Sequence, residues 1–140
     1  MIKAVILDVD NTLLDFNFDG SDDLAVPVKW DGANTTWAVF FWEPDSLHFR
    51  SEPDLCCNPI PVSEDKSLYE ITYITDESGP VRTEIRIRFF NDPALSYSFV
   101  GDYTGLMLKC YAVQGDSKKN YMTHYKSRDA LTEALQDLLP

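Results

Sequence analysis

A chain of 140 residues in which 44% of the side chains are hydrophobic and 13% aromatic has enough apolar material for one globular domain with a core, so a disordered chain is excluded. Its formal net charge of −11 disfavours nucleic acid as a partner, because phosphates carry the same sign, and favours bound cations or a basic protein. No apolar stretch is long enough to span a bilayer, so we expect a single soluble domain over residues 1–140 without a membrane span.

The N-terminal stretch contains two aspartates after a short apolar run, Ala-Val-Ile-Leu-Asp-Val-Asp-Asn-Thr-Leu-Leu-Asp at residues 4–15. It resembles the first motif of haloacid-dehalogenase-type phosphatases, which implies that Asp8 and Asp10 act as nucleophile and general acid beside magnesium. Such an enzyme needs helices between parallel strands, and the segment after Asp15 has no apolar stripe at helical spacing. A fragment of a magnesium-dependent phosphatase is therefore the alternative function.

A cation-binding pattern follows in residues 15–24, Asp-Phe-Asn-Phe-Asp-Gly-Ser-Asp-Asp-Leu. Oxygen-bearing side chains stand at loop positions 1, 3, 5 and 9 with glycine at position 6, and calcium takes about six to eight oxygen ligands from such a loop. Position 12 is Val26 and not the bidentate glutamate of a helix-loop-helix hand, so position 9 must close the cage. The predicted Ca²⁺ ligands are Asp15, Asn17, Asp19, the backbone carbonyl of Ser21, and Asp23. The alternative is a turn rich in solvated carboxylates.

The remaining chain is mostly of strand character. Alternating polar and apolar residues in Thr83–Phe89 predict a half-buried antiparallel strand with Ile85, Ile87 and Phe89 inward. Aromatic and β-branched runs of strand length occupy residues 36–42, 68–75 and 106–113, with turn signals between them. This pattern predicts a mainly β fold, either an antiparallel β-sandwich or a single propeller-like sheet.

Only the C-terminal segment, residues 127–139, has helical periodicity. Ser127 is the predicted N-cap. The apolar residues of one face are Ala130, Leu131, Ala134, Leu135 and Leu138. We expect a closing helix that covers an edge or a face of a sheet, with a partner-binding helix as the alternative.

The cysteines and histidines carry no catalytic motif. Cys56, Cys57 and Cys110 permit one disulfide between Cys110 and either neighbour, or three thiols, and their spacing predicts no zinc site. His48 and His124 lie in different segments without a motif for a nucleophile, so we expect them to be surface or half-buried strand residues. The chain is therefore not expected to be an enzyme.

The calcium-loop spacing followed by Leu24-Ala25-Val26 resembles the loops of FG-GAP and VCBS repeats, in which the loop joins two β-strands. Together with the segments Phe41–Phe49, Asp54-Leu55 and Asn58-Pro59, it is similar to small bacterial proteins related to periplasmic inhibitors of invertebrate-type lysozyme. Some members of that group are immunity proteins against peptidoglycan-cleaving toxins.

This resemblance implies a calcium-binding protein interaction domain whose partner is a basic cell-wall hydrolase. In the lysozyme inhibitors a Ser-Gly turn enters the hydrolase cleft, and Ser78-Gly79 stands at a comparable place, although these residues also suit an ordinary hairpin turn. The expected location is the periplasm or another extracytoplasmic space if a leader has been removed, with the cytosol as the alternative.

Overall fold

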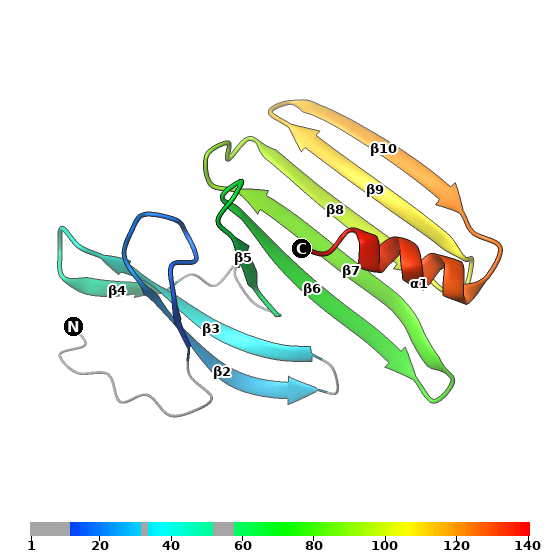
Figure 1. The fold of residues 1–140 in the computed structure, drawn as a ribbon, viewed down its shortest axis with the longest axis horizontal. Coiled ribbons are helices and arrows are strands. Elements are labelled where there is room, and N and C mark those ends of the chain that lie inside the picture. Colours follow the sequence, from blue (N-terminus) through cyan, green and yellow to red (C-terminus); the bar gives the residue numbers. More distant parts are fainter. Residues whose placement is uncertain (1–11, 32–33, 52–57) are drawn as a thin grey trace. The chain divides into compact units, whose positions relative to one another are not determined.

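The computed structural model describes residues 12–31, 34–51 and 58–140, which form β-strands and one α-helix (Figure 1). The chain divides into two compact units, Met1–Glu70 and Ile71–Pro140. In chain order the elements are β1 (Thr12–Leu14), β2 (Asp23–Asp31), β3 (Asn34–Glu43), β4 (His48–Ser51), β5 (Ile60–Val62), β6 (Ser67–Asp76), β7 (Gly79–Phe89), β8 (Leu95–Asp102), β9 (Met107–Gln114), β10 (Ser117–His124) and α1 (Arg128–Asp137).

The first unit contains a four-stranded antiparallel sheet with the order β1-β2-β3-β4. Leu24 pairs with Phe40 and Ala25 with Val39, and because successive residues of a strand face opposite sides, these two pairs lie on opposite faces of the sheet. Pro27 cannot donate a ladder hydrogen bond, and the register shifts between Pro27 and Lys29. This bulge leaves the intervening Val28 57% exposed.

The second unit contains β7 to β10 and the part of β6 from Ile71 onward, and these strands belong to a sheet with the order β10-β9-β8-β7-β6-β5. Ile85 and Ile87 of β7 are buried, with exposed Arg86 between them, as the alternation in the sequence predicts. Phe89, the third residue expected to face inward, is half-buried at the end of the strand.

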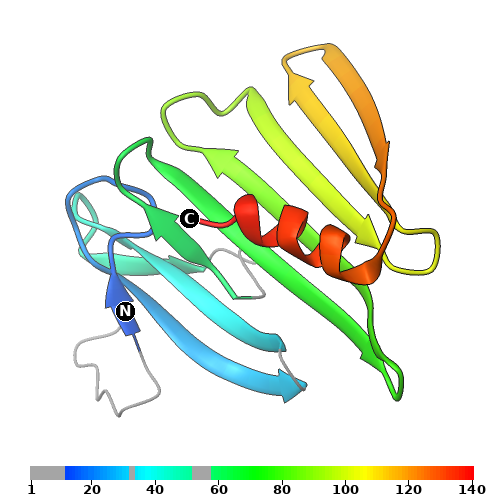
Figure 2. The same ribbon diagram turned by 45° about the vertical axis from the view of Figure 1, so that its right-hand side comes forward.

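Helix α1 packs on one face of this sheet (Figure 2). Ser127 is its N-cap and accepts a hydrogen bond from the Ala130 amide at 3.1 Å. Leu131 and Leu135 are buried on the apolar face of the helix, and Leu135 lies directly over Gly101 of β8. The helix is therefore the closing element that the sequence predicts, although it ends at Asp137 and not at Leu139.

The predicted fold class is confirmed: the protein is mainly β, with two antiparallel sheets and one C-terminal helix, and two sheets are what a β-sandwich contains. The single domain over residues 1–140 stays a prediction. Within the described residues, the one helix is too short and too polar to cross a membrane.

The close approach of α1 to β8 makes Gly101 a specific test of this packing. A Cβ at Gly101 meets Leu135 Cδ1 at 2.6 Å and Cδ2 at 2.9 Å, and Leu135 is held in the core. We expect Gly101→Ala to lower the free energy of unfolding by about 1–3 kcal/mol through overpacking, measured by urea denaturation.

Gly105→Ala is the matched control. Its added Cβ approaches the terminal Met107 Cε at 2.8 Å, and that flexible thioether can turn away. The control should be neutral or slightly stabilising because alanine restricts the unfolded chain. Equal losses in both variants would contradict the packing of Leu135 against Gly101.

Candidate functional site

The predicted calcium loop connects β1 to β2, two antiparallel strands paired from Thr12–Ala25 to Leu14–Asp23. The loop thus begins and ends at adjacent points of one sheet, and the two elements that flank it are both strands. Gly20 has φ +90° and Phe18 has φ +62°, so the chain reverses inside the loop through two left-handed residues.

Backbone amides inside the loop point at its polar side chains. Asp15 accepts hydrogen bonds from the Asp19 amide at 3.1 Å and from the Gly20 amide at 2.8 Å, one on each carboxylate oxygen. Asn17 Oδ1 accepts from the Asp19 amide at 3.3 Å, and Asp19 Oδ1 accepts from the Ser21 amide at 2.9 Å. Four of the five predicted ligand residues are therefore joined in one local network.

Asp23, the fifth predicted ligand, is the most buried residue of the site. Its side chain is 0% exposed. Oδ2 accepts a hydrogen bond from the Phe16 amide and Oδ1 one from the Trp42 amide, each at 2.9 Å. The carboxylate consequently ties the start of the loop and strand β3 to the first residue of β2.

The pKa of Asp23 is raised from its ordinary value of 3.8 to about 6. Burial is the main cause, because desolvation penalises the charged form. The amides of Trp42 and Phe16 oppose this shift by stabilising the ionised form, and the nearby charge of Asp19 adds to it. Among the described residues, no cationic side chain pairs with Asp23.

The chemistry of the loop suits a hard cation, although its carboxylates are not gathered around one point. The described residues contain no group of three His, Cys, Asp or Glu side chains arranged to hold a metal ion. Each carboxylate offers about four lone-pair sites, so an oxygen that accepts one amide retains the capacity to bind a cation. Asp15, Asn17, Asp19, Ser21 and Asp23 are thus a candidate ligand set held by the backbone.

Two further residues take part in this site that the sequence pattern did not single out. Phe16 is 2% exposed, and its burial fixes the amide that donates to Asp23. Trp42 donates through its backbone from β3, 19 positions away in the chain. The apolar character of Phe16, between Asp15 and Asn17, is a sequence signal for its burial. The backbone donor of Trp42 lies on another strand, and such a contact leaves no signal in a single sequence.

Of the predicted partner-binding residues, Ser78 lies in the turn between β6 and β7, and Gly79 is the first residue of β7. The Ser78 hydroxyl and amide both donate to Asp76 Oδ1, at 2.6 and 2.8 Å, and these hydrogen bonds lower the pKa of Asp76. Gly79 has φ +112°, which suits glycine. The geometry is that of an ordered hairpin turn, and binding of a partner by this turn stays a prediction.

The other candidate residues occupy structural positions or lie outside the described residues. His48 is half-buried in β4 and His124 is exposed in β10, as expected. Cys110 is a free thiol, and burial raises its pKa. Asp8, Asp10, Cys56 and Cys57 lie outside the described residues. Every resolved strand register is antiparallel, whereas the phosphatase resemblance implies parallel strands.

Comparison of this chain with protein-family models, with curated proteins and with solved structures finds no match.

The raised pKa of Asp23 predicts a specific dependence of stability on pH in the presence of a chelator. Because the folded state holds the proton more tightly than the unfolded state, the contribution of Asp23 is fully present below pH 4 and is lost as pH rises through about 6. The shift corresponds to about 2–3 kcal/mol. We expect the free energy of unfolding to fall by this amount relative to Asp23→Asn between pH 4 and 7, measured by urea denaturation.

Asp23→Asn supplies the reference because it cannot titrate. It loses one of the two amide hydrogen bonds at every pH, which lowers stability by a constant amount. Parallel curves for the two proteins across this pH range would show that Asp23 titrates as an exposed carboxylate.

Proposed function

We propose that the protein is a calcium-stabilised β domain that binds another protein, most specifically as an inhibitor or immunity protein against a peptidoglycan-degrading hydrolase. The proposal of calcium binding rests on the environment of Asp23. Its carboxylate is fully buried near Asp19, and among the described residues no cationic side chain pairs with it. A buried charge of this kind needs a counter-charge or a proton.

Calcium fits the donor set because every predicted ligand offers an oxygen, and the amide network already holds Asp15, Asn17 and Asp19 in one turn. The bound ion supplies positive charge that keeps Asp23 ionised. Its role is structural, because the carboxylates it neutralises lie at the junction of β1, β2 and the amide of Trp42 in β3.

The inhibitory role rests on charge and on the resemblance of the loop and the segments Phe41–Phe49, Asp54-Leu55 and Asn58-Pro59 to lysozyme inhibitors. The segment Met1–Glu70 contains 14 acidic and 4 basic residues, whereas Ile71–Pro140 contains 9 and 8. An acidic surface accelerates encounter with a basic muramidase. The corresponding location is extracytoplasmic, where calcium is abundant enough to fill a site of moderate affinity.

Calcium should therefore raise the melting temperature selectively. At a calcium concentration 100-fold above the dissociation constant, we expect an increase of about 5–10 °C over chelator, and a smaller increase with magnesium, which demands tighter octahedral geometry. The measurement is a thermal melt followed by circular dichroism in calcium, magnesium and chelator.

Asp19→Ala and Asp22→Ala remove the same charge from neighbouring positions of the loop. Asp19 is a predicted ligand, whereas Asp22 is exposed and outside the ligand spacing. Asp19→Ala should abolish the calcium-dependent increase, and Asp22→Ala should retain most of it. An unchanged melting temperature in wild-type protein with calcium would refute the calcium site.

The hydrolase partner is tested directly with an invertebrate-type lysozyme and a turbid peptidoglycan suspension. We expect the protein to slow clearing, and Ser78→Ala to weaken inhibition about tenfold or more if the turn enters the cleft. Asp76→Ala removes the acceptor of the Ser78 hydrogen bonds but keeps the Ser78 hydroxyl, so it should weaken inhibition less than Ser78→Ala does. If the wild-type protein does not inhibit the lysozyme, the proposal of a hydrolase partner is refuted. The proposal of a calcium site is tested independently by the thermal melt.

A further inference from the structure

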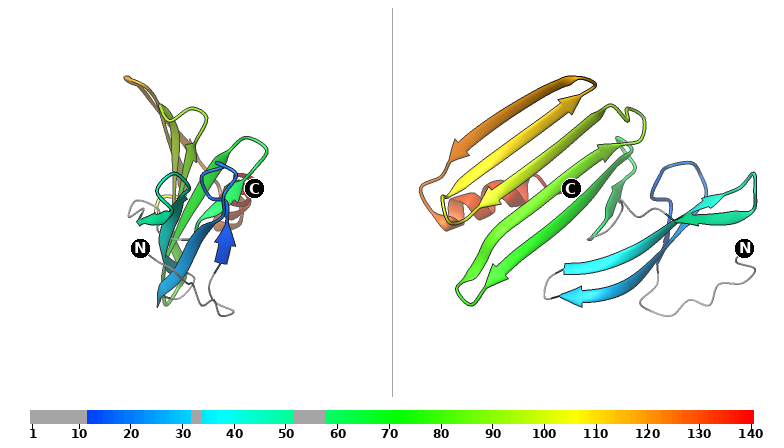
Figure 3. Two further views of the ribbon diagram at one scale, coloured as in Figure 1. Left: turned by 90° about the vertical axis from the view of Figure 1, so that its left-hand side faces the viewer. Right: turned by 180° about the vertical axis from the view of Figure 1, so that it is seen from behind.

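Strand β10 is a long, regular edge of the sheet in the second unit. It pairs with β9 through eight consecutive residues, from Ser117–Gln114 to His124–Met107, without a bulge. It stands at the end of the strand order, with none of the described strands on its outer side (Figures 1 and 3). All eight of its residues are exposed.

The outer backbone of β10 is available for another strand. In an antiparallel ladder, alternate residues direct their N–H and C=O groups toward the neighbour and the others direct theirs outward. The strand contains no proline, and the described residues provide no partner for its outward groups. An edge with these properties is the geometry that accepts an added strand from a partner.

The side chains of β10 present a cation and an apolar residue on each face. Strand alternation places Lys118 and Met122 on one face, and Lys119 and Tyr121 on the other. Tyr121 is 58% and Met122 56% exposed, which is high for side chains of this size.

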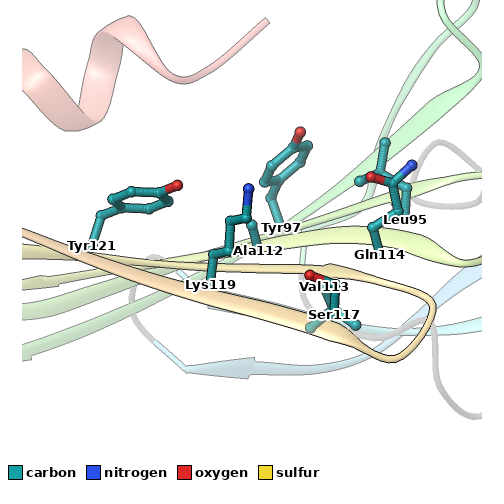
Figure 4. A pocket seen from close by; sticks show the side chains of 8 residues that line it. All are labelled: Leu95, Tyr97, Ala112, Val113, Gln114, Ser117, Lys119 and Tyr121. Carbon is teal, nitrogen blue, oxygen red and sulfur yellow. The ribbon is translucent and has the colours of Figure 1, made fainter.

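A cavity of about 340 Å³ lies on the face of Lys119 and Tyr121, and Figure 4 shows both side chains rising beside Tyr97. A second cavity, of about 290 Å³, is lined by residues of β9 and β10 that include Lys109, Tyr111 and Met122. Apolar surface is therefore accessible along β10, next to its lysines.

Charge identifies the occupant of this edge. Strand β10 contains two lysines, Lys118 and Lys119, and no acidic side chain, in a chain whose net charge is −11. A second copy of β10 would bring like charges together, whereas carboxylates placed across from lysines stabilise a strand pair. We propose that the outer edge of β10 accepts an extended acidic segment of a partner protein as an additional antiparallel strand.

The register follows from the order of the side chains. Two apolar residues of the incoming strand lie opposite Met122 and Tyr121, and two acidic residues lie opposite Lys119 and Lys118. This surface is separate in sequence from the calcium loop and does not depend on the proposed inhibition of a hydrolase.

The probe is a fluorescent, capped peptide with the order Thr-Val-Val-Thr-Glu-Glu-Thr, titrated with the full chain and followed by anisotropy at low salt. We expect saturable binding that Lys118→Glu/Lys119→Glu weakens about tenfold or more. The control Lys29→Glu/Lys66→Glu makes the same change in net charge outside β10 and its neighbouring residues, and should bind as wild type does. All four lysines are exposed, so circular dichroism should show folded proteins.

Two modified peptides separate strand addition from simple charge attraction. N-methylation of alternate peptide amides leaves the charge intact but removes the ladder hydrogen bonds, so it should abolish binding. A peptide with lysines in place of the glutamates should bind the Lys118→Glu/Lys119→Glu variant better than it binds wild type. No saturable binding, equal binding of the N-methylated peptide, or self-association through β10 in sedimentation experiments would overturn the proposal.

Discussion

The carboxylate of Asp23 joins three segments, which are the calcium loop, β2 and β3. It begins β2, accepts the Phe16 amide from the loop and accepts the Trp42 amide from β3. Strand alternation directs it to the same face as Ala25 and Val39, both buried, so it is desolvated by an apolar layer. Removing an ionised carboxylate from water costs several kcal/mol, and the two amides recover only part of that cost.

This cost connects the protonation of Asp23 to the calcium that we propose for the loop. A proton on Asp23 relieves the desolvation penalty, and its pKa of about 6 reflects that balance. A cation relieves the same penalty while keeping the carboxylate ionised, and it also offsets the repulsion between Asp19 and Asp23. The proton and the proposed cation would thus compete for one buried charge.

The sequence predicts those parts of the fold that depend on local periodicity. The alternation around Ile85 and Ile87 and the helical stripe around Leu131 and Leu135 correspond to β7 and α1, because both patterns arise from burial of one face. Strand β2 was not identified from its own sequence, since Pro27 interrupts it and residues 23–25 are buried on both faces. β10 was not identified either, because all its residues are exposed and an edge strand of polar residues has no apolar alternation.

The same distinction applies to the candidate site. Loop spacing predicts Asp15, Asn17, Asp19 and Asp23 as ligands, and the structure joins the first three through backbone amides without gathering the carboxylates around one point. The burial of Asp23 does not follow from spacing, because it depends on the register between β2 and β3 and on a backbone donor from Trp42. Tertiary register turns a solvated acidic turn into a buried charge, and burial of that charge is the main reason why the pKa of Asp23 is raised to about 6.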